Sequence, residues 1–269
     1  MRIRITHSTT HRYDVPVRAI SQVLRLSPRD SDCQHVAHWR ISLSTDGQMK
    51  AEEDAFGNLV QRFETDGPLE EMTITVEGVV DTFDTAGILR GVNERVPLEV
   101  FLRDTDLTGA DDAIIAFAEA QATKAATSLD TLHNLLDALH ERLGHDGEAQ
   151  ATTRSAAETF ATGHGRPSGL AHVFVAAARH LEIPARIVTG YFAPENESVS
   201  MNAMHAWAEA HADGYGWIGF DVAHGVCPTN AHVRLACGLD YGDVTPVRGA
   251  RKGGGREAMT VMVNISGQQ

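Results

Sequence analysis

Thiols and imidazoles are the side chains of this sequence that could perform covalent or metal chemistry. The chain has fourteen histidines and three cysteines, which are Cys33, Cys227 and Cys237. Three scattered thiols are too few for a disulfide framework or a thiolate metal site. His133 and His140 are two turns apart on one predicted helix, and no HExxH or CxxC motif occurs. We therefore expect no metal centre and no cofactor.

The net charge of the chain limits the kinds of molecule that the protein can bind. The chain carries 23 Lys and Arg against 36 Asp and Glu, for a formal net charge of −13. Such a surface repels phosphate backbones and anionic headgroups, which argues against nucleic acid and membrane as partners. No apolar run approaches the ~20 residues of a bilayer span, and residues 1–6 alternate without the apolar block of a signal peptide. We expect a soluble cytoplasmic protein.

Strand patterns fill the first part of the chain. Residues 2–7 and 22–26 alternate between apolar and polar, and residues 36–43 and 72–80 have the composition of a half-buried pleated surface. Residues 54–58 form a turn signal between them. The sequence predicts an all-β domain over residues 1–90.

Helical patterns begin after Pro97. Thr127 with Asp130 predicts a capped helix whose leucine stripe ends at Gly144. A second helix, over residues 168–181, is apolar on most of its circumference and is therefore expected in the core. Pro167 suits its first turn, where a missing N–H has no cost.

Strands return over residues 185–191, 203–211 and 217–221, and residues 259–265 alternate near the end. A helix followed by an antiparallel sheet predicts an α+β domain over residues 91–269, made of a helical connector and a core. The basic, Gly-rich stretch 248–256 is typical of a solvated hairpin loop rather than a phosphate site.

Several segments resemble one family. They are Ala171-His172-Val173-Phe174 with residues 183–191, His205-Ala206-Trp207-Ala208-Glu209, and Trp217-Ile218-Gly219-Phe220-Asp221. In this order they resemble the bacterial transglutaminase-like proteins of the papain-like cysteine protease/transglutaminase superfamily. Residues 22–29 and 54–58 are similar to the β domain that precedes the core in that branch, and residues 232–249 are similar to its tail. The resemblance covers nearly the whole chain and implies a cysteine-proteinase/transglutaminase-like core.

The resemblance also implies a Cys-His-Asp triad, in which His205 is the base and Asp221 the acid that orients it. Their separation of sixteen residues fits neighbouring antiparallel strands joined by a turn around Gly214. Trp207 and His172 are expected to line the cleft, although core packing would also explain the tryptophan and a buried hydrogen-bonding role the histidine.

The nucleophile is where the sequence departs from the family. The family motif Gly-Val-Cys-x-Asp-x-Ala-His falls on residues 165–172, so Pro167 occupies the position of the cysteine and Gly169 that of the acid. Ser168 is one residue along, and a helix turns by about 100° per residue, so a local shift could aim its hydroxyl instead. Alternatively, Ser168 helps to cap the helix. Cys227 reads as a free thiol on the wrong element, and Cys33 and Cys237 read as packing residues.

These observations predict a protein that has lost its covalent chemistry and binds a peptide or acyl group. Loss of a triad nucleophile typically costs about a millionfold in turnover. The alternative is an active amide hydrolase or acyl transferase that uses Ser168 with His205 and Asp221. A third reading is an architectural subunit that partners an active paralogue.

Overall fold

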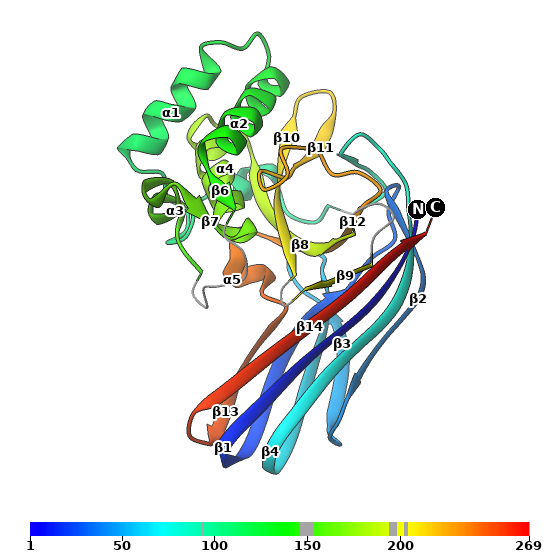
Figure 1. Ribbon diagram of the computed structural model, residues 1–269. Helices are drawn as coiled ribbons and strands as arrows, with labels where there is room; N and C mark the ends of the chain where they lie inside the picture. Colours follow the sequence, from blue (N-terminus) through cyan, green and yellow to red (C-terminus); the bar gives the residue numbers. More distant parts are fainter. Residues whose placement is uncertain (93, 146–152, 194–197, 202–203, 269) are drawn as a thin grey trace.

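Two antiparallel sheets and a group of helices make up the protein (Figure 1). The computed structural model describes residues 1–269 apart from residues 93, 146–152, 194–197, 202–203 and 269. This arrangement confirms the predicted α+β class, with a sheet built largely from the N-terminal residues. In the described part of the chain, no helix is long and apolar enough to cross a membrane.

The larger sheet has seven strands. They are β1 (Arg2–Ser27), β2 (Gln34–Leu43), β3 (Gln48–Glu53), β4 (Leu59–Thr82), β9 (Ser198–Met201), β13 (Val247–Gly253) and β14 (Glu257–Gln268). The segments 2–7 and 22–26, expected as separate strands, belong to the single strand β1. Pro16 lies where the pairing of β1 with β4 shifts register, between Arg12 and Val17, a place where a strand tolerates a proline without an N–H donor.

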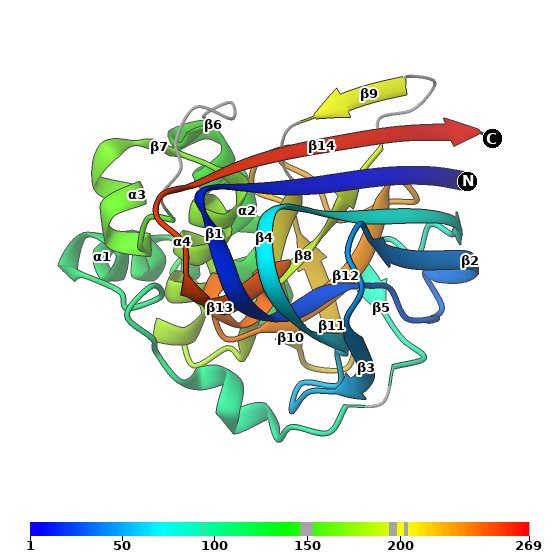
Figure 2. The same ribbon diagram turned by 90° about the horizontal axis from the view of Figure 1, so that it is seen from below.

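The last strands of the chain complete this sheet. The first half of β1 pairs with β14 and its second half pairs with β13, so both ends of the chain lie side by side (Figure 2). The predicted division at residue 90 stays a prediction, but the larger sheet includes residues far beyond it. The stretch 248–256, expected as a hairpin loop, is largely strand: residues 247–253 form β13, and residues 254–256 join β13 to β14, the next strand paired with β1.

The smaller sheet has the order β12-β8-β10-β11-β5. Its strands are β12 (His232–Gly238), β8 (Ala185–Phe192), β10 (His205–Ala212), β11 (Gly216–Phe220) and β5 (Ile88–Leu89). Two further short strands, β6 (Gly144–His145) and β7 (His164–Gly165), pair with each other.

Helices pack on one face of the smaller sheet. They are α1 (Asp112–Ala122), α2 (Ser128–Arg142), α3 (Ala156–Thr162), α4 (Pro167–His180) and α5 (Tyr241–Val244). The 3₁₀ helix η1 (Leu98–Leu102) instead packs its Phe101 against Trp217 and Leu89, on the opposite side of the sheet. The helix expected in the core is α4, which is buried from Ser168 to Arg179. The capping box of Thr127 and Asp130 begins α2, as predicted. The sequence analysis missed α3, although Ser155 and Glu158 form a second capping box there.

An apolar interface joins the two sheets. Ile5, Val80 and Ile265 of the larger sheet pack against Tyr191 and Val233 of the smaller one. The predicted turn at 54–58 strengthens the junction. The Asn58 amide donates to the carbonyl of Cys237 at 2.7 Å and accepts from its N–H at 2.8 Å.

A buried ion-pair network crosses the face of the smaller sheet. Glu209 of β10 accepts from Arg186 of β8 at 2.7 Å and from Arg234 of β12 at 2.7 Å, and Arg186 also pairs with Glu94. Burial alone would raise the pKa of Glu209, but the charges of Arg234 and Arg186 lower it to about 2. Removing one partner of such a network leaves buried charge uncompensated.

We predict that Glu209→Gln lowers the free energy of unfolding by about 3–5 kcal/mol near neutral pH, measured by denaturant titration. Because the folded pKa is depressed, the ion-pair contribution is fully present above the unfolded pKa of about 4.3 and is lost as the pH falls toward 2. The difference between wild type and variant should therefore shrink in acid. The matched control Glu52→Gln, in the more exposed Arg62 pair, should change stability by less than about 1 kcal/mol. Equal losses in the two variants would contradict this account.

Candidate functional site

Asp221 is the most heavily hydrogen-bonded side chain of the site. Its Oδ2 lies 2.7 Å from Nε2 of His205, 2.7 Å from Nδ1 of His224 and 3.1 Å from Nε2 of His232. Its Oδ1 accepts from the backbone N–H of Ala223 at 3.1 Å and from that of His224 at 3.4 Å. Burial alone would raise the pKa of Asp221, but His205 and the hydrogen bonds of the three imidazoles hold that pKa well below its usual value. Asp221 is therefore a buried, stable anion.

His205 and Asp221 meet because their strands are neighbours. His205 is the first residue of β10, and Asp221 follows the last residue of β11, which pairs with β10. On the other side of β10, His205 is paired with Gly190 of β8. A Cβ at Gly190 would lie 2.0 Å from the Val233 carbonyl oxygen and 2.7 Å from the Trp207 ring. The glycine at position 190 therefore allows β12 and the Trp207 indole to pack directly against the β8 backbone beside His205.

Nδ1 of His205 faces away from the carboxylate. The Nε2–H group donates to Asp221, so a neutral His205 carries its lone pair on Nδ1. Within the part of the chain that the structure describes, this nitrogen has no hydrogen-bond partner. Trp207 is buried and stacks on the His205 ring with a centroid distance of 6.0 Å. The imidazole is thus held on one side by Asp221 and against the indole.

His232 is fixed in one tautomer. The backbone N–H of Thr229 donates to its Nδ1 at 3.1 Å, so its proton must lie on Nε2, which then donates to Asp221. Burial lowers the pKa of His232 despite the opposing effect of Asp221, which favours the neutral ring. His224 completes the set from the surface, with its ring stacked on Phe192 at 4.0 Å between centroids.

His205, Asp221 and His232 lie close enough together to suggest a metal site. A metal ligand needs a lone pair on the coordinating nitrogen, and its other ring nitrogen normally donates a hydrogen bond. His232 has the opposite pattern, because its outer nitrogen accepts from Thr229 and its inner nitrogen carries the proton. The donor set therefore fits a carboxylate held by imidazole N–H groups better than it fits a metal ion.

The helix start expected to carry the nucleophile is α4. Pro167 is its first residue, preceded by Arg166 in an extended conformation. Ser168 is next and is buried. Across the described residues, neither Ser168 nor any cysteine forms a hydrogen bond with His205, and the Ser168 hydroxyl has no partner.

Thr159 of α3 fills the space beside this helix start. A Cβ at Gly169 would lie 2.7 Å from the Thr159 hydroxyl, and one at Gly165 would lie 2.8 Å from its methyl group. Thr159 is fully buried, and its hydroxyl has no partner among the described groups. A side chain at position 169 would therefore require Thr159 to move or to be replaced.

The comparisons with known proteins match two separate regions of the chain. Residues 3–81 match the bacterial transglutaminase-like N-terminal region, and residues 115–222 match the transglutaminase-like superfamily. This is a transglutaminase-like protein.

Relatives of the same length exist in mycobacteria. An uncharacterized protein of Mycobacterium leprae is 26% identical, with 98% of each chain covered. One of Mycobacterium tuberculosis is 22% identical over 92% of this chain and 87% of its own. A crystal structure from Cytophaga hutchinsonii, named "Putative Cysteine Protease", has a TM-score of 0.78 at 20% identity and covers 99% of this chain and 90% of its own. That likeness shows that the two proteins share a fold.

In this transglutaminase-like protein, His172 has the buried hydrogen-bonding environment that was the alternative to a place in the cleft. The side chain is fully buried in α4, where Nδ1 donates to the Arg154 carbonyl at 3.1 Å and Nε2 accepts from the Tyr241 N–H at 3.0 Å. Burial lowers the pKa of His172 to about 4. Its neutral ring therefore ties α4 to α5.

The cysteines lie outside the Asp221 cluster. Cys227 Sγ is 3.8 Å from Nε2 of His133, and burial raises the pKa of this thiol. Burial also raises the pKa of Cys33, against the effect of a hydrogen bond from Ser31. Cys237 is buried beside Trp207 and Val188. The environments of Cys33 and Cys227 therefore do not favour a reactive thiolate.

His224 and His232 are the site residues that the sequence analysis missed. His232 was recognised only as part of the family-like tail, and His224 only as one of many histidines. A signal for His224 was its position three residues after Asp221, within reach of a turn. His232 comes from a third strand, and no local pattern could have predicted its contact.

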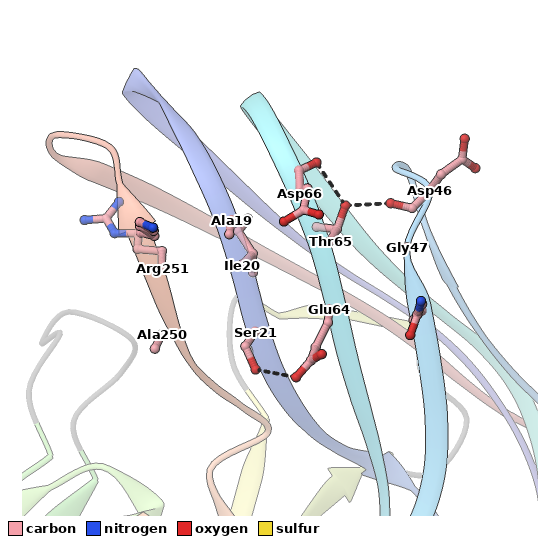
Figure 3. A pocket seen from close by; sticks show the side chains of 12 residues that line it. Ala19, Ile20, Ser21, Asp46, Gly47, Glu64, Thr65, Asp66, Ala250 and Arg251 are labelled. Carbon is pink, nitrogen blue, oxygen red and sulfur yellow. Dashed lines mark hydrogen bonds between the residues drawn. The ribbon is translucent and has the colours of Figure 1, made fainter.

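A hollow on the larger sheet is separate from this site. It has a volume of about 720 Å³ and is lined by β1, β3, β4 and β13 (Figure 3). Ala19 and Ser21 are among the residues that line it, and Glu64 accepts from Ser21 at 3.4 Å. Asp46 and Arg251 lie at opposite sides. It contains none of the predicted site residues.

We predict that nitrogen NMR of the wild-type protein near neutral pH shows His232 protonated on Nε2 and unprotonated on Nδ1. The His232→Gln variant should assign the signal, and added zinc should leave the tautomer unchanged. A zinc-dependent shift of His232 to the opposite tautomer would contradict the hydrogen-bonded account and favour a metal ligand.

Proposed function

We propose that this transglutaminase-like protein binds a peptide or an acyl group beside His205 without forming a covalent intermediate. It is then a pseudoenzyme whose scaffold resembles that of cysteine proteases. We also propose that the protein is located in the cytoplasm, as expected from the sequence. The observation that carries it is the start of α4, where Pro167 occupies the first helical position and offers no nucleophilic atom.

The two ends of the site support this reading in different ways. At the acid-base end, Asp221 receives five hydrogen bonds, one of them from Nε2 of His205 at 2.7 Å. At the other end, Thr159 packs against Gly165 and Gly169, where a larger side chain would collide with it. The start of α4 thus packs against Thr159 through two glycines. Since a triad without its nucleophile loses about a millionfold in turnover, acyl transfer at a useful rate is not expected.

The competing function is a serine hydrolase or acyl transferase with Ser168 as nucleophile. Its hydroxyl is buried and has no partner in the described region, whereas an activated serine needs a base within hydrogen-bond reach. An architectural role beside an active paralogue is a further possibility, which co-purification would reveal.

We predict that a serine-directed fluorophosphonate leaves the wild-type protein unmodified, as measured by intact mass. The matched variant Ser168→Ala should behave identically, because the Ser168 hydroxyl has no hydrogen-bonded base. A covalent adduct that forms on the wild type and disappears in Ser168→Ala would establish Ser168 as a nucleophile. It would contradict the proposal that the protein is catalytically inactive.

We also predict that Pro167→Cys creates a thiol with a pKa at least about one unit below the ordinary value of ~8.5, because the N-terminus of α4 favours a thiolate. The pH dependence of alkylation, followed by peptide mass mapping, measures it. Adding an acid at position 169 requires relief of the Thr159 contact, so Gly169→Asp should be tolerated better with Thr159→Ala than without it.

The double variant Pro167→Cys with His205→Ala is the control for this test. It keeps the helix terminus and removes the imidazole, so it separates the two sources of activation. A thiol at position 167 with an unshifted pKa in both variants would mean that the start of α4 is not the family's nucleophile position.

A further inference from the structure

The strand β13 is a free edge of the larger sheet. In the described part of the chain it pairs with β1 alone. Figure 3 shows it on the outer side of β1, with β4 and β3 following on the other side. Residues 248–253 are all exposed. An exposed edge strand offers its backbone to another strand.

The backbone groups that face outward from β13 belong to its odd-numbered residues. The N–H of Arg25 in β1 donates to the Pro246 carbonyl at 2.8 Å. Alternate residues of an antiparallel ladder point their N–H and C=O to opposite sides. Because the pairing continues without a shift from this bond to Lys252, the even-numbered residues face β1, and Gly249 and Arg251 face away. Gly249 has no side chain, so its exposure is that of the backbone.

The side chains on this edge are basic. The strand contains Arg248, Arg251 and Lys252 and no acidic residue, in a chain whose net charge is −13. Within the described residues, Lys252 has no ion pair or hydrogen bond, and neither has Arg18, which lies beside Gly253. These two charges are therefore not neutralised within the chain.

The two arginines of β13 differ from these cations. Arg251 lies 3.6 Å from Glu257 and over the Tyr13 ring, so an internal carboxylate already balances its charge. Arg248 donates to the Gly242 carbonyl at 3.3 Å, which is a neutral group. Lys252 and Arg18 are thus the cations left for a partner.

The opposite edge of this part of the sheet is β3, where the glutamates are paired within the chain. Glu52 lies 2.7 Å from Arg62, and Glu53 lies 2.6 Å from Arg95. Charged side chains on an edge strand discourage pairing with a strand of like charge, and two copies of β13 would bring their basic residues together. The charge on β13 therefore disfavours a second copy of this strand and favours an acidic one.

An extended peptide fits this edge better than a nucleic acid does. A peptide has both N–H and C=O groups for the outward backbone of Gly249 and Arg251, whereas a phosphate backbone has only acceptors. Three acidic residues, Asp46, Glu64 and Asp66, line the same hollow as Lys252. They would repel a long polyanion that reached across the sheet.

We propose that β13 binds an extended acidic segment of another protein, which adds to the larger sheet as a further strand. The backbone of that segment pairs with Gly249 and Arg251, and its carboxylates lie beside Lys252 and Arg18. Arg248 and Lys252 are four residues apart on one face of the strand, about 13 Å along it, so acidic residues with the same spacing match them. This surface is separate from the His205 site, and no covalent step is involved.

Isothermal titration of the full chain with two blocked heptapeptides tests the proposal. The acidic peptide, Thr-Glu-Val-Thr-Val-Glu-Thr, has both glutamates on one face of a strand and the same length as β13. The basic peptide has Lys in place of each Glu. At low salt the acidic peptide should bind at least about tenfold more tightly, because opposite charges on neighbouring strands attract and like charges repel. Added salt should reduce the difference.

Lys252→Glu should weaken binding of the acidic peptide by about threefold or more, because it replaces an attraction with a repulsion. Lys50→Glu is the matched control, since Lys50 is an exposed lysine of β3 at the opposite edge. It should leave the affinity unchanged. Thermal unfolding shows whether both variants are folded.

Backbone pairing is tested on the wild type alone. Two versions of the acidic peptide carry N-methyl groups, one at its odd positions and the other at its even positions. Only one set of amides faces β13 in a strand pair. One version should therefore lose about tenfold or more in affinity, and the other should bind like the parent peptide.

Four results would overturn the proposal. They are equal affinity for the acidic and basic peptides, unchanged binding in a folded Lys252→Glu variant, equal effects of the two methylation patterns, and tighter binding of a single-stranded oligonucleotide than of the acidic peptide. The last would show that the basic edge recognises polyanions. None of these results depends on whether Ser168 or His205 is active, so the proposed function is tested separately.

Discussion

A buried carboxylate that receives five hydrogen bonds holds the site together. Asp221 is fully inaccessible to solvent, so its charge is tolerated only while the groups around it remain in place. Those groups come from the start of β10, the start of β12 and the turn after β11. The close contact of three strands at Gly190 and Trp207 serves the same constraint. The orientation of His205 is thus a consequence of satisfying Asp221.

Under the proposed function, the same constraint would keep the pair of His205 and Asp221 in place without a nucleophile. Removing Asp221 or His205 would leave buried polar groups unpaired and weaken the sheet, whatever the chemistry. A proline at the start of α4 has no such penalty, because proline is well suited to the first turn of a helix. Gly165 and Gly169 also give Thr159 its place. Stability therefore protects the pair of His205 and Asp221, whereas a proline at position 167 carries no such cost.

Much of this could be predicted from the sequence, because local patterns carry it. Capping residues, the leucine stripe and the apolar α4 predicted the helices, and strand spacing brought His205 and Asp221 together. The contacts that could not be predicted join residues far apart in the sequence. Residues 257–268 join the larger sheet because β1 offers them its edge, and the contact of His232 with Asp221 spans separate strands. The burial of His172 depends on α5, which comes nearly seventy residues later.

The central claim is that His205 has no nucleophile to activate. The most direct measurement is the rate of hydrolysis of an activated aryl ester by wild type and by His205→Ala, with thermal unfolding to confirm that both are folded. The account predicts the same slow rate in both proteins. A fall of about a hundredfold or more in His205→Ala, the size expected when a working general base is removed, would contradict it.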